Sequence, residues 1–220
     1  EVLKLTDWHT DDMFSLEDSL SIKANFSRVF CDVERFPEDS IEIMAQYGMG
    51  VLYEKSDDGL TLRIVNQEMR NSILKNYYWP HHEKLNLAVE QQLKENGKAT
   101  IVDCHSFPNE PFKRDLNQNP DRPDFNIGTD AFHTPKKLIT LTKNFFNEKG
   151  FSIGLDWPYS GTIVPLAQYK KNKNIQSIML EVNRSLYLDE NTNLRSKQYL
   201  KTKGIIQEYL KLLQENCNLF

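Results

Sequence analysis

A short apolar run that ends in a histidine is the segment of this chain whose residue types most directly suggest chemistry. Residues 100–102 are apolar or β-branched, His105 follows them, and Pro108 then breaks the strand pattern. In open α/β sheets the carboxyl ends of the strands form the ligand crevice, so we expect His105 to face a site. A single histidine is more often a hydrogen-bonded residue than a metal ligand. The prediction of a metal site therefore depends on two further segments.

The first of these segments lies near the N-terminus, where His9 and Asp12 are three residues apart. On a turn or a first helical turn this spacing places an imidazole and a carboxylate on one face, within reach of one divalent cation. Together with His105 they make a set of three ligands with a fourth position open for water, as in catalytic zinc sites. The alternative is that Asp11 and Asp12 cap a helix that begins at Met13.

The second segment is the apolar run 177–182, which contains Glu181 in what we predict to be a central strand. A glutamate is almost never fully buried without a partner, so Glu181 requires an ion pair, a metal or a catalytic task. Beside a metal-bound water it would act as a general base that passes the proton to a leaving nitrogen. The alternative is a structural ion pair between Glu181 and Arg184.

Together these segments resemble the N-formylglutamate amidohydrolase family, which is related to the zinc carboxypeptidases and aspartoacylase. The resemblance covers nearly the whole chain, through residues 5–12, 27–36, 77–82, 103–108, 122–124, 158–162 and 181–187. It implies that His9, Asp12 and His105 hold Zn²⁺ or another divalent transition metal, and that Glu181 is the general base. The related carboxypeptidases have a glutamate where this chain has Asp12.

The resemblance also implies a reaction. We expect metal-dependent hydrolysis of a small N-acyl amino acid, with N-formyl-L-glutamate giving formate and L-glutamate in histidine degradation. The alternatives are another zinc deacylase or carboxypeptidase-like peptidase, or a binding protein without catalysis on the same fold. Family members usually open with an apolar strand that leads into Pro-His-Ser-Gly. Because this chain starts after that point and without a methionine, we expect an N-terminal strand to be missing from it.

Arginines are the expected ligands for the substrate's carboxylates, because a planar guanidinium binds a carboxylate through two parallel hydrogen bonds. The related carboxypeptidases use an Asn-Arg pair for this purpose, and Glu34-Arg35 resembles the corresponding place. Arg35 is therefore the first choice and Arg184 the second. Arg28 is a third candidate, for which an ordinary ion pair with Asp32 or Glu34 is the alternative.

The segment 157–162 combines an aromatic pair, hydroxyl groups and a glycine between two predicted strands. We expect it to cover the site as a substrate loop, with Tyr159 as a substrate-binding residue. A plain turn is the alternative.

Composition limits the class of protein. With 220 residues, 39% of them hydrophobic, the chain can bury one core, and we predict a single domain over residues 1–220. The net charge of −4 and the lack of a basic stripe argue against nucleic-acid binding. No stretch approaches the roughly 20 apolar residues of a membrane span, and no signal peptide is visible. Cys31, Cys104 and Cys217 suggest reduced core thiols in a cytoplasmic protein.

The order of predicted elements indicates the fold class. Strand-like runs occur at residues 28–33, 50–53, 100–105, 151–155 and 176–182. Apolar residues recur with helical spacing after Pro80 and after Pro135, and a closing helix is predicted over 191–213. This alternation predicts an α/β fold, a three-layer αβα sandwich around a mostly parallel or mixed sheet, which is also the zinc-carboxypeptidase-like fold that the resemblance implies. Composition and pattern leave the oligomeric state open.

Overall fold

The computed structural model describes residues 1–17 and 19–216, which form two compact units. Unit 1 consists of Glu1–Thr6, Ile22–Ala88 and Phe112–Leu116, and unit 2 of the remaining described residues. Helix α3, Trp79–Asn96, begins in unit 1 and continues without a break into unit 2. The single domain over residues 1–220 stays a prediction.

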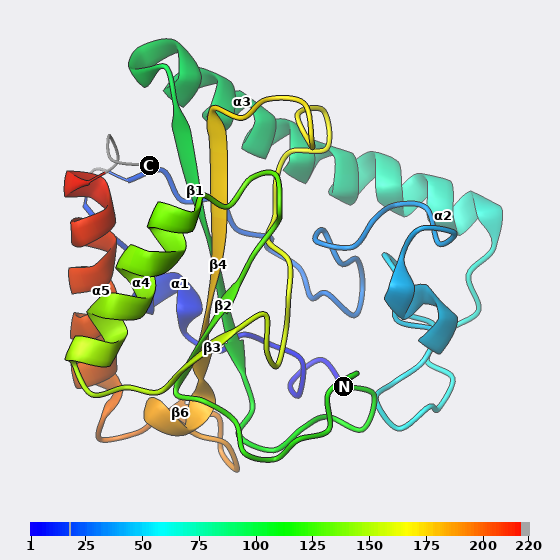
Figure 1. The fold of residues 1–220 in the computed structure, drawn as a ribbon. Helices are drawn as coiled ribbons and strands as arrows, with labels where there is room; N and C mark the ends of the chain where they lie inside the picture. The colour runs from blue at the N-terminus through cyan, green and yellow to red at the C-terminus, as the bar shows by residue number, and fades with distance from the viewer. Residues whose placement is uncertain (18, 217–220) are drawn as a thin grey trace. The chain divides into compact units, whose positions relative to one another are not determined.

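Unit 2 is built on a mixed sheet of four strands in the order β1-β4-β2-β3 (Figure 1). The strands are β1 (Ala99–Phe107), β2 (Phe125–Gly128), β3 (Ile153–Leu155) and β4 (Ile175–Asn183). Strand β4 is parallel to β1 and antiparallel to β2, which is parallel to β3. Helices flank this sheet, so the predicted mixed α/β class is confirmed.

Helices α4 (Lys136–Glu148) and α5 (Tyr199–Glu215) lie together on one side of the sheet in Figure 1. They bury a shared apolar face, because alternate residues of a strand point to the same side and residues four apart on a helix do so as well. The core formed there contains residues from the strands and from both helices: Phe125, Ile127, Ile178, Leu180 and Val182 from the sheet, and Leu138, Phe146, Ile206 and Tyr209 from the helices. The opposite face, called the polar face below, carries Asp103, His105, Glu181 and Asn126 together with apolar residues such as Met179 and Phe107.

Shorter elements complete unit 2. They are helix α1 (Thr10–Met13), the 3₁₀ turn η3 (Arg184–Leu186) and a small hairpin of β5 (Leu188–Asp189) and β6 (Leu194–Arg195). The predicted closing helix over 191–213 begins later, at Tyr199, because the hairpin occupies the residues before it. Strand β2 is an element that the sequence pattern did not indicate.

Unit 1 contains helical segments joined by turns: η1 (Ile43–Tyr47), α2 (Gln67–Ile73), η2 (Leu74–Tyr78) and the start of α3. Within its described residues the only β pairings are isolated bridges, Met49 with Tyr53 and Lys55 with Thr61. The strands predicted at 28–33 and 50–53 are therefore wrong.

A side chain replaces the missing strand pairing around residues 28–33. The guanidinium of Arg63 donates to the carbonyl oxygens of Phe30 at 2.7 Å and Val29 at 3.1 Å. The backbone N–H of Asp32 donates to the carbonyl of Val51 at 2.8 Å. Buried backbone groups must find partners, and here a partly buried arginine satisfies carbonyls that a sheet would otherwise pair.

The other predicted strands and helices are confirmed, with shifts of a few residues at their ends. Cys31 is buried and Cys104 partly exposed, and both are free thiols, whereas Cys217 lies outside the described residues. None of the helices in residues 1–17 and 19–216 combines the length and apolar character that crossing a membrane requires.

Candidate active site

One row of residues runs across the whole sheet of unit 2 on its polar face. The backbone register pairs His105 of β1 with Glu181 of β4, Glu181 with Asn126 of β2, and Asn126 with Gly154 of β3. Laterally paired residues project to the same face of a sheet. The structure therefore brings the predicted general base, Glu181, directly beside the predicted ligand His105. Both residues are buried, with 6% of their surface exposed.

His105 faces two carboxylates. Its Nε2 lies 3.0 Å from Oδ1 of Asp103, which is two residues earlier on the same strand. Its Nδ1 lies 3.4 Å from Oδ2 of Asp7. A neutral imidazole has only one N–H, so a neutral ring can donate a hydrogen bond to only one of these two carboxylates.

Asp7 is held in a fixed orientation by the end of β1. Its Oδ1 accepts hydrogen bonds from the backbone N–H of Ser106 at 2.9 Å and from the Ser106 hydroxyl at 2.8 Å. Nε of Arg184 donates to that hydroxyl oxygen at 3.2 Å, and Nη2 of Arg184 lies 3.9 Å from Oδ1. These contacts leave Oδ2 directed toward His105.

The structure places Asp12 against helix α5. Its Oδ2 accepts from the Tyr199 hydroxyl at 2.6 Å and its Oδ1 from Nζ of Lys203 at 2.6 Å, while Arg195 lies 3.3 Å away. Hydrogen bonds from Lys203 and Tyr199 lower the pKa of the Asp12 carboxyl below its usual value. Asp12 is thus surrounded by cations of the protein itself.

His9 also contacts residues near Asp12, namely Asn193 and Tyr199, and it does not belong to the row that contains His105. Its Nε2 is 3.3 Å from the carbonyl oxygen of Asn193, and its ring meets the Tyr199 ring edge-on at 5.7 Å. Over the described residues, the ligand atoms of His9, Asp12 and His105 do not come within 4.8 Å of one another as a group. As arranged, these three residues do not fit a single ion.

Two of the predicted substrate-binding arginines belong to unit 1. Arg35 lies between two buried carboxylates, with Nε 3.7 Å from Oδ2 of Asp32 and Nη1 3.6 Å from Oε1 of Glu42. Its side chain is 30% exposed. Asp32 also accepts the Tyr53 hydroxyl at 2.9 Å. Arg28 lies in a turn of the same unit.

Tyr159 is in contact with a buried arginine. The guanidinium of Arg122 lies over the Tyr159 ring at 5.5 Å and over the Phe107 ring at 5.9 Å, and its Nη1 is 3.4 Å from the Tyr159 hydroxyl. Phe107 is two residues beyond His105 and therefore on the same face of β1. This places the loop around Tyr159 beside the row.

Sequence reasoning missed three residues around the row: Asp7, Asp103 and Asn126. Asp103 carried a usable signal, because residues two apart on a strand share a face. Asp7 lies two residues before His9, but only the folded chain shows that it, and not Asp12, faces His105.

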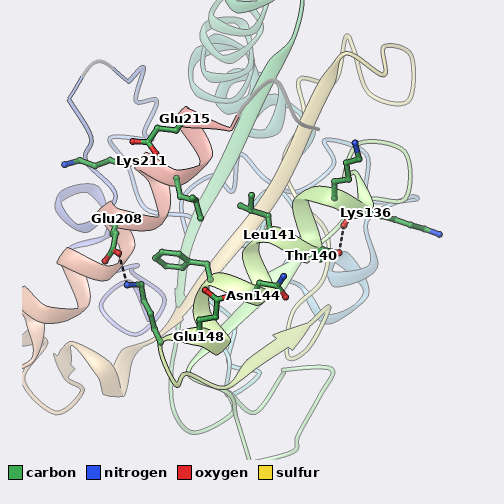
Figure 2. Close-up of a pocket in the computed structure, with 12 residues that line it drawn as sticks. Lys136, Thr140, Leu141, Asn144, Glu148, Glu208, Lys211 and Glu215 are labelled. Carbon is green, nitrogen blue, oxygen red and sulfur yellow. Dashed lines mark hydrogen bonds and ion pairs between the residues drawn. The ribbon is translucent and has the colours of Figure 1, made fainter.

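A separate groove of about 1070 Å³ lies between α4 and α5 (Figure 2). Charged side chains of both signs surround it, including Lys149, which forms an ion pair with Glu208 at 2.8 Å. Since α4 and α5 cover the apolar face of the sheet, the sheet separates this groove from the row.

Comparison with known proteins decides the family. The family model described as N-formylglutamate amidohydrolase matches residues 1–188. The chain belongs to the N-formylglutamate amidohydrolase family. The match runs through both units and ends before α5.

Solved structures support the fold of this family member. A crystal structure of N-formylglutamate amidohydrolase from Ralstonia eutropha is similar, with a TM-score of 0.75 and 24% sequence identity over 90% of this chain and 76% of that one. A gene product of Agrobacterium tumefaciens is similar at a TM-score of 0.59 and 16% identity, over 86% of this chain and 69% of that one. No curated protein sequence matches the chain.

Proposed function

We propose that this chain hydrolyses the amide bond of a small N-acyl amino acid, and that its substrate is N-formyl-L-glutamate, which gives formate and L-glutamate. Membership of the N-formylglutamate amidohydrolase family supports the reaction. The observation that carries the proposal is the direct pairing of Glu181 with His105 on two parallel strands.

We further propose that the reaction depends on a divalent metal ion, zinc in the first place, with His105 and Asp7 among its ligands. Two ligand atoms of a tetrahedral zinc ion, each bound at about 2.0–2.2 Å, lie roughly 3.3–3.5 Å apart. The separation of 3.4 Å between Nδ1 of His105 and Oδ2 of Asp7 matches that spacing. Asp103 then occupies the place of the carboxylate that orients a metal-binding histidine through its other nitrogen. When bound, the metal would polarise the formyl carbonyl and acidify the attacking water.

Glu181 has the role of general base in this proposal. Its carboxylate accepts a proton from the water that attacks the formyl carbon, and it transfers that proton to the amide nitrogen as the C–N bond breaks. The amino group of glutamate then leaves, and formate carries the new C–O bond. A buried position favours this role because electrostatic interactions are stronger where water is excluded.

The carboxylates of the substrate require hydrogen-bond donors, which a guanidinium supplies with a positive charge and a tyrosine hydroxyl supplies without one. Arg35, Arg28 and Tyr159 are proposed for this task, as the sequence predicts. Arg184 already contacts Ser106 and Asp7, which supports a role in orienting Asp7 in addition to any contact with substrate. Another deacylase of the same chemistry would differ in the size of the acyl group that it accepts.

The test is release of formate from N-formyl-L-glutamate by zinc-loaded protein, with N-acetyl-L-glutamate and a metal-stripped sample alongside. We expect formate release that stops on metal removal and returns when zinc is added. Bound zinc with no hydrolysis of either compound would contradict the substrate. Full activity in the stripped sample would contradict the metal.

A further inference from the structure

The segment from Asp156 to Pro165 rests on the polar face of the sheet at two glycines. A Cβ atom at Gly154 would lie 2.1 Å from the carbonyl oxygen of Trp157, and one at Gly128 would lie 2.3 Å from that of Gly161. Gly154 is part of the row, and Gly128 is the neighbour of Asn126 on that face. The backbone of this segment therefore lies against the sheet where only glycine leaves room for it.

Asn126 holds the first half of the segment. The residue is fully buried, its Nδ2 donates to the carbonyl oxygen of Tyr159 at 2.8 Å, and its Oδ1 accepts from the N–H of Trp157 at 3.1 Å. Both polar ends of the amide are thus bonded to the backbone on either side of Pro158. Asn126 is also the lateral neighbour of Glu181, one strand spacing of about 4.8 Å away.

Asp103 holds the second half. Its Oδ2 accepts from the backbone N–H of Ile163 at 2.8 Å, while its Oδ1 faces Nε2 of His105. One carboxylate therefore orients the site histidine and fixes the position of the segment. Together Asn126 and Asp103 hold residues 157–163 beside the His105–Glu181 pair.

We propose that Asn126 is a positioning residue that holds residues 157–163 as a wall beside Glu181, and that this wall restricts the acyl group of the substrate to formyl. The proposal rests on the proposed function, since Glu181 must act at the scissile amide. Space beside Glu181 is then space for the acyl group, and moving the wall to admit an acetyl methyl group would break the hydrogen bonds of the buried Asn126 amide. Because both ends of the Asn126 amide are bonded to the wall, Asn126 acts through it and not on the substrate.

Hydrogen exchange measured by mass spectrometry tests the wall without any substrate. In Asn126→Ala we expect the amide of Trp157 to exchange about 10-fold faster, since one hydrogen bond of ordinary net strength is lost. Exchange within β1 and β4 should stay as in the wild type. Asn144→Ala, which removes an exposed asparagine of α4, is the matched control and should change nothing in residues 157–163. Unchanged exchange at Trp157 in Asn126→Ala would overturn the proposal.

Substrate selectivity tests whether the wall restricts the acyl group to formyl. We expect the ratio of kcat/KM for N-formyl-L-glutamate to that for N-acetyl-L-glutamate to fall at least 10-fold in Asn126→Ala, mainly through KM. Asn126→Asp conserves the volume and the acceptor for Trp157 but loses the donor to Tyr159, so it should lower the ratio as well and carries the test if the alanine variant does not fold. A ratio within 2-fold of wild type in both variants would overturn the inference. A wild-type protein that binds metal but hydrolyses neither compound would contradict the proposed function instead. In that case hydrogen exchange would be the one remaining test of whether Asn126 holds residues 157–163.

Discussion

At the scale of single residues, Glu181 is both buried and proposed as the general base. Replacing it by glutamine keeps the shape and one acceptor oxygen, exchanges the other oxygen for an NH2 donor, and removes the base. We expect Glu181→Gln to fold, to bind zinc as the wild type does, and to lose about 10²–10⁴-fold in kcat. Formate release and metal content of the same preparation are the measurements.

The control for this variant is Glu208→Gln, which changes an exposed glutamate of α5 in the groove shown in Figure 2. It should retain the wild-type rate. If Glu181→Gln also retained that rate, the assignment of Glu181 as general base would be wrong.

Asp7 and Asp12 are competing candidates for the metal, because the sequence spacing favours Asp12 and the folded chain places Asp7 beside His105. We expect Asp7→Asn to weaken zinc binding by about 10–100-fold or more, because it changes the oxygen that faces Nδ1 of His105. Asp12→Asn should leave zinc affinity within 2-fold of wild type. Competition with a chromophoric chelator measures both affinities, and the reverse order of effects would restore Asp12 as the ligand.

At the scale of elements, Asp12 joins α1 to α5 through Tyr199 and Lys203. The pKa of its carboxyl is lowered in the folded protein from a usual value of 3.8, so the ionised form stabilises the fold. This contribution is present above the unfolded pKa and is lost as the pH falls through the lower, folded value. Since the Asp12 side chain is 37% exposed, solvent screening limits the effect to about 1 kcal/mol or less.

We therefore expect Asp12→Asn to be less stable than wild type at pH 7 and the difference to shrink at pH values below about 4. Urea unfolding of the two proteins at pH 7 and pH 3 measures this difference. Asn144→Ala serves as the control, because it removes no charge. A stability difference that grew on acidification would show that the ion pair does not fasten α1 to α5.

Whether the sequence reveals an element depends on which groups form hydrogen bonds with the backbone of that segment. The runs that became β1 and β4 are apolar over enough residues to indicate buried strands, and both are confirmed. Residues 28–33 carry a similar composition but form turns, because Arg63 from a distant segment takes their carbonyl groups. Strand β2 has only four residues, too few for an alternating pattern to be recognised.

The candidate site, like the fold, could be predicted only in part from the sequence. His105 and Glu181 lie on the two well-predicted strands, and their lateral pairing follows from the register. Asp7 and Asn126 could not be assigned, since neither lies in an apolar run and their roles depend on contacts across 99 and 33 residues of chain, to Ser106 and to Tyr159. Long-range side-chain contacts of this kind have no local sequence pattern.

At the scale of the whole molecule, the chain combines two compact units with one family match. The family model runs through both units, and α3 passes from one to the other as an uninterrupted helix. Whether the two units unfold in a single step therefore tests the prediction of one domain.

One variant in each unit tests this prediction. Tyr53→Phe in unit 1 removes the hydroxyl that donates to buried Asp32, and should cost about 1–3 kcal/mol. Ile206→Ala in unit 2 removes a fully buried side chain of α5, and should cost about 2–5 kcal/mol. Leu200→Ala, on the same helix but 78% exposed, is the control and should cost less than about 0.5 kcal/mol.

If the chain is one cooperative domain, urea unfolding followed by circular dichroism gives a single transition, and both Tyr53→Phe and Ile206→Ala lower its midpoint. A single transition with unchanged slope also means that each variant lowers the free energy of unfolding of the whole chain. Two transitions, each moved only by the variant in its own unit, would instead show that the units fold independently. In that case residues 1–220 are two domains, and the elements of the row fold without unit 1.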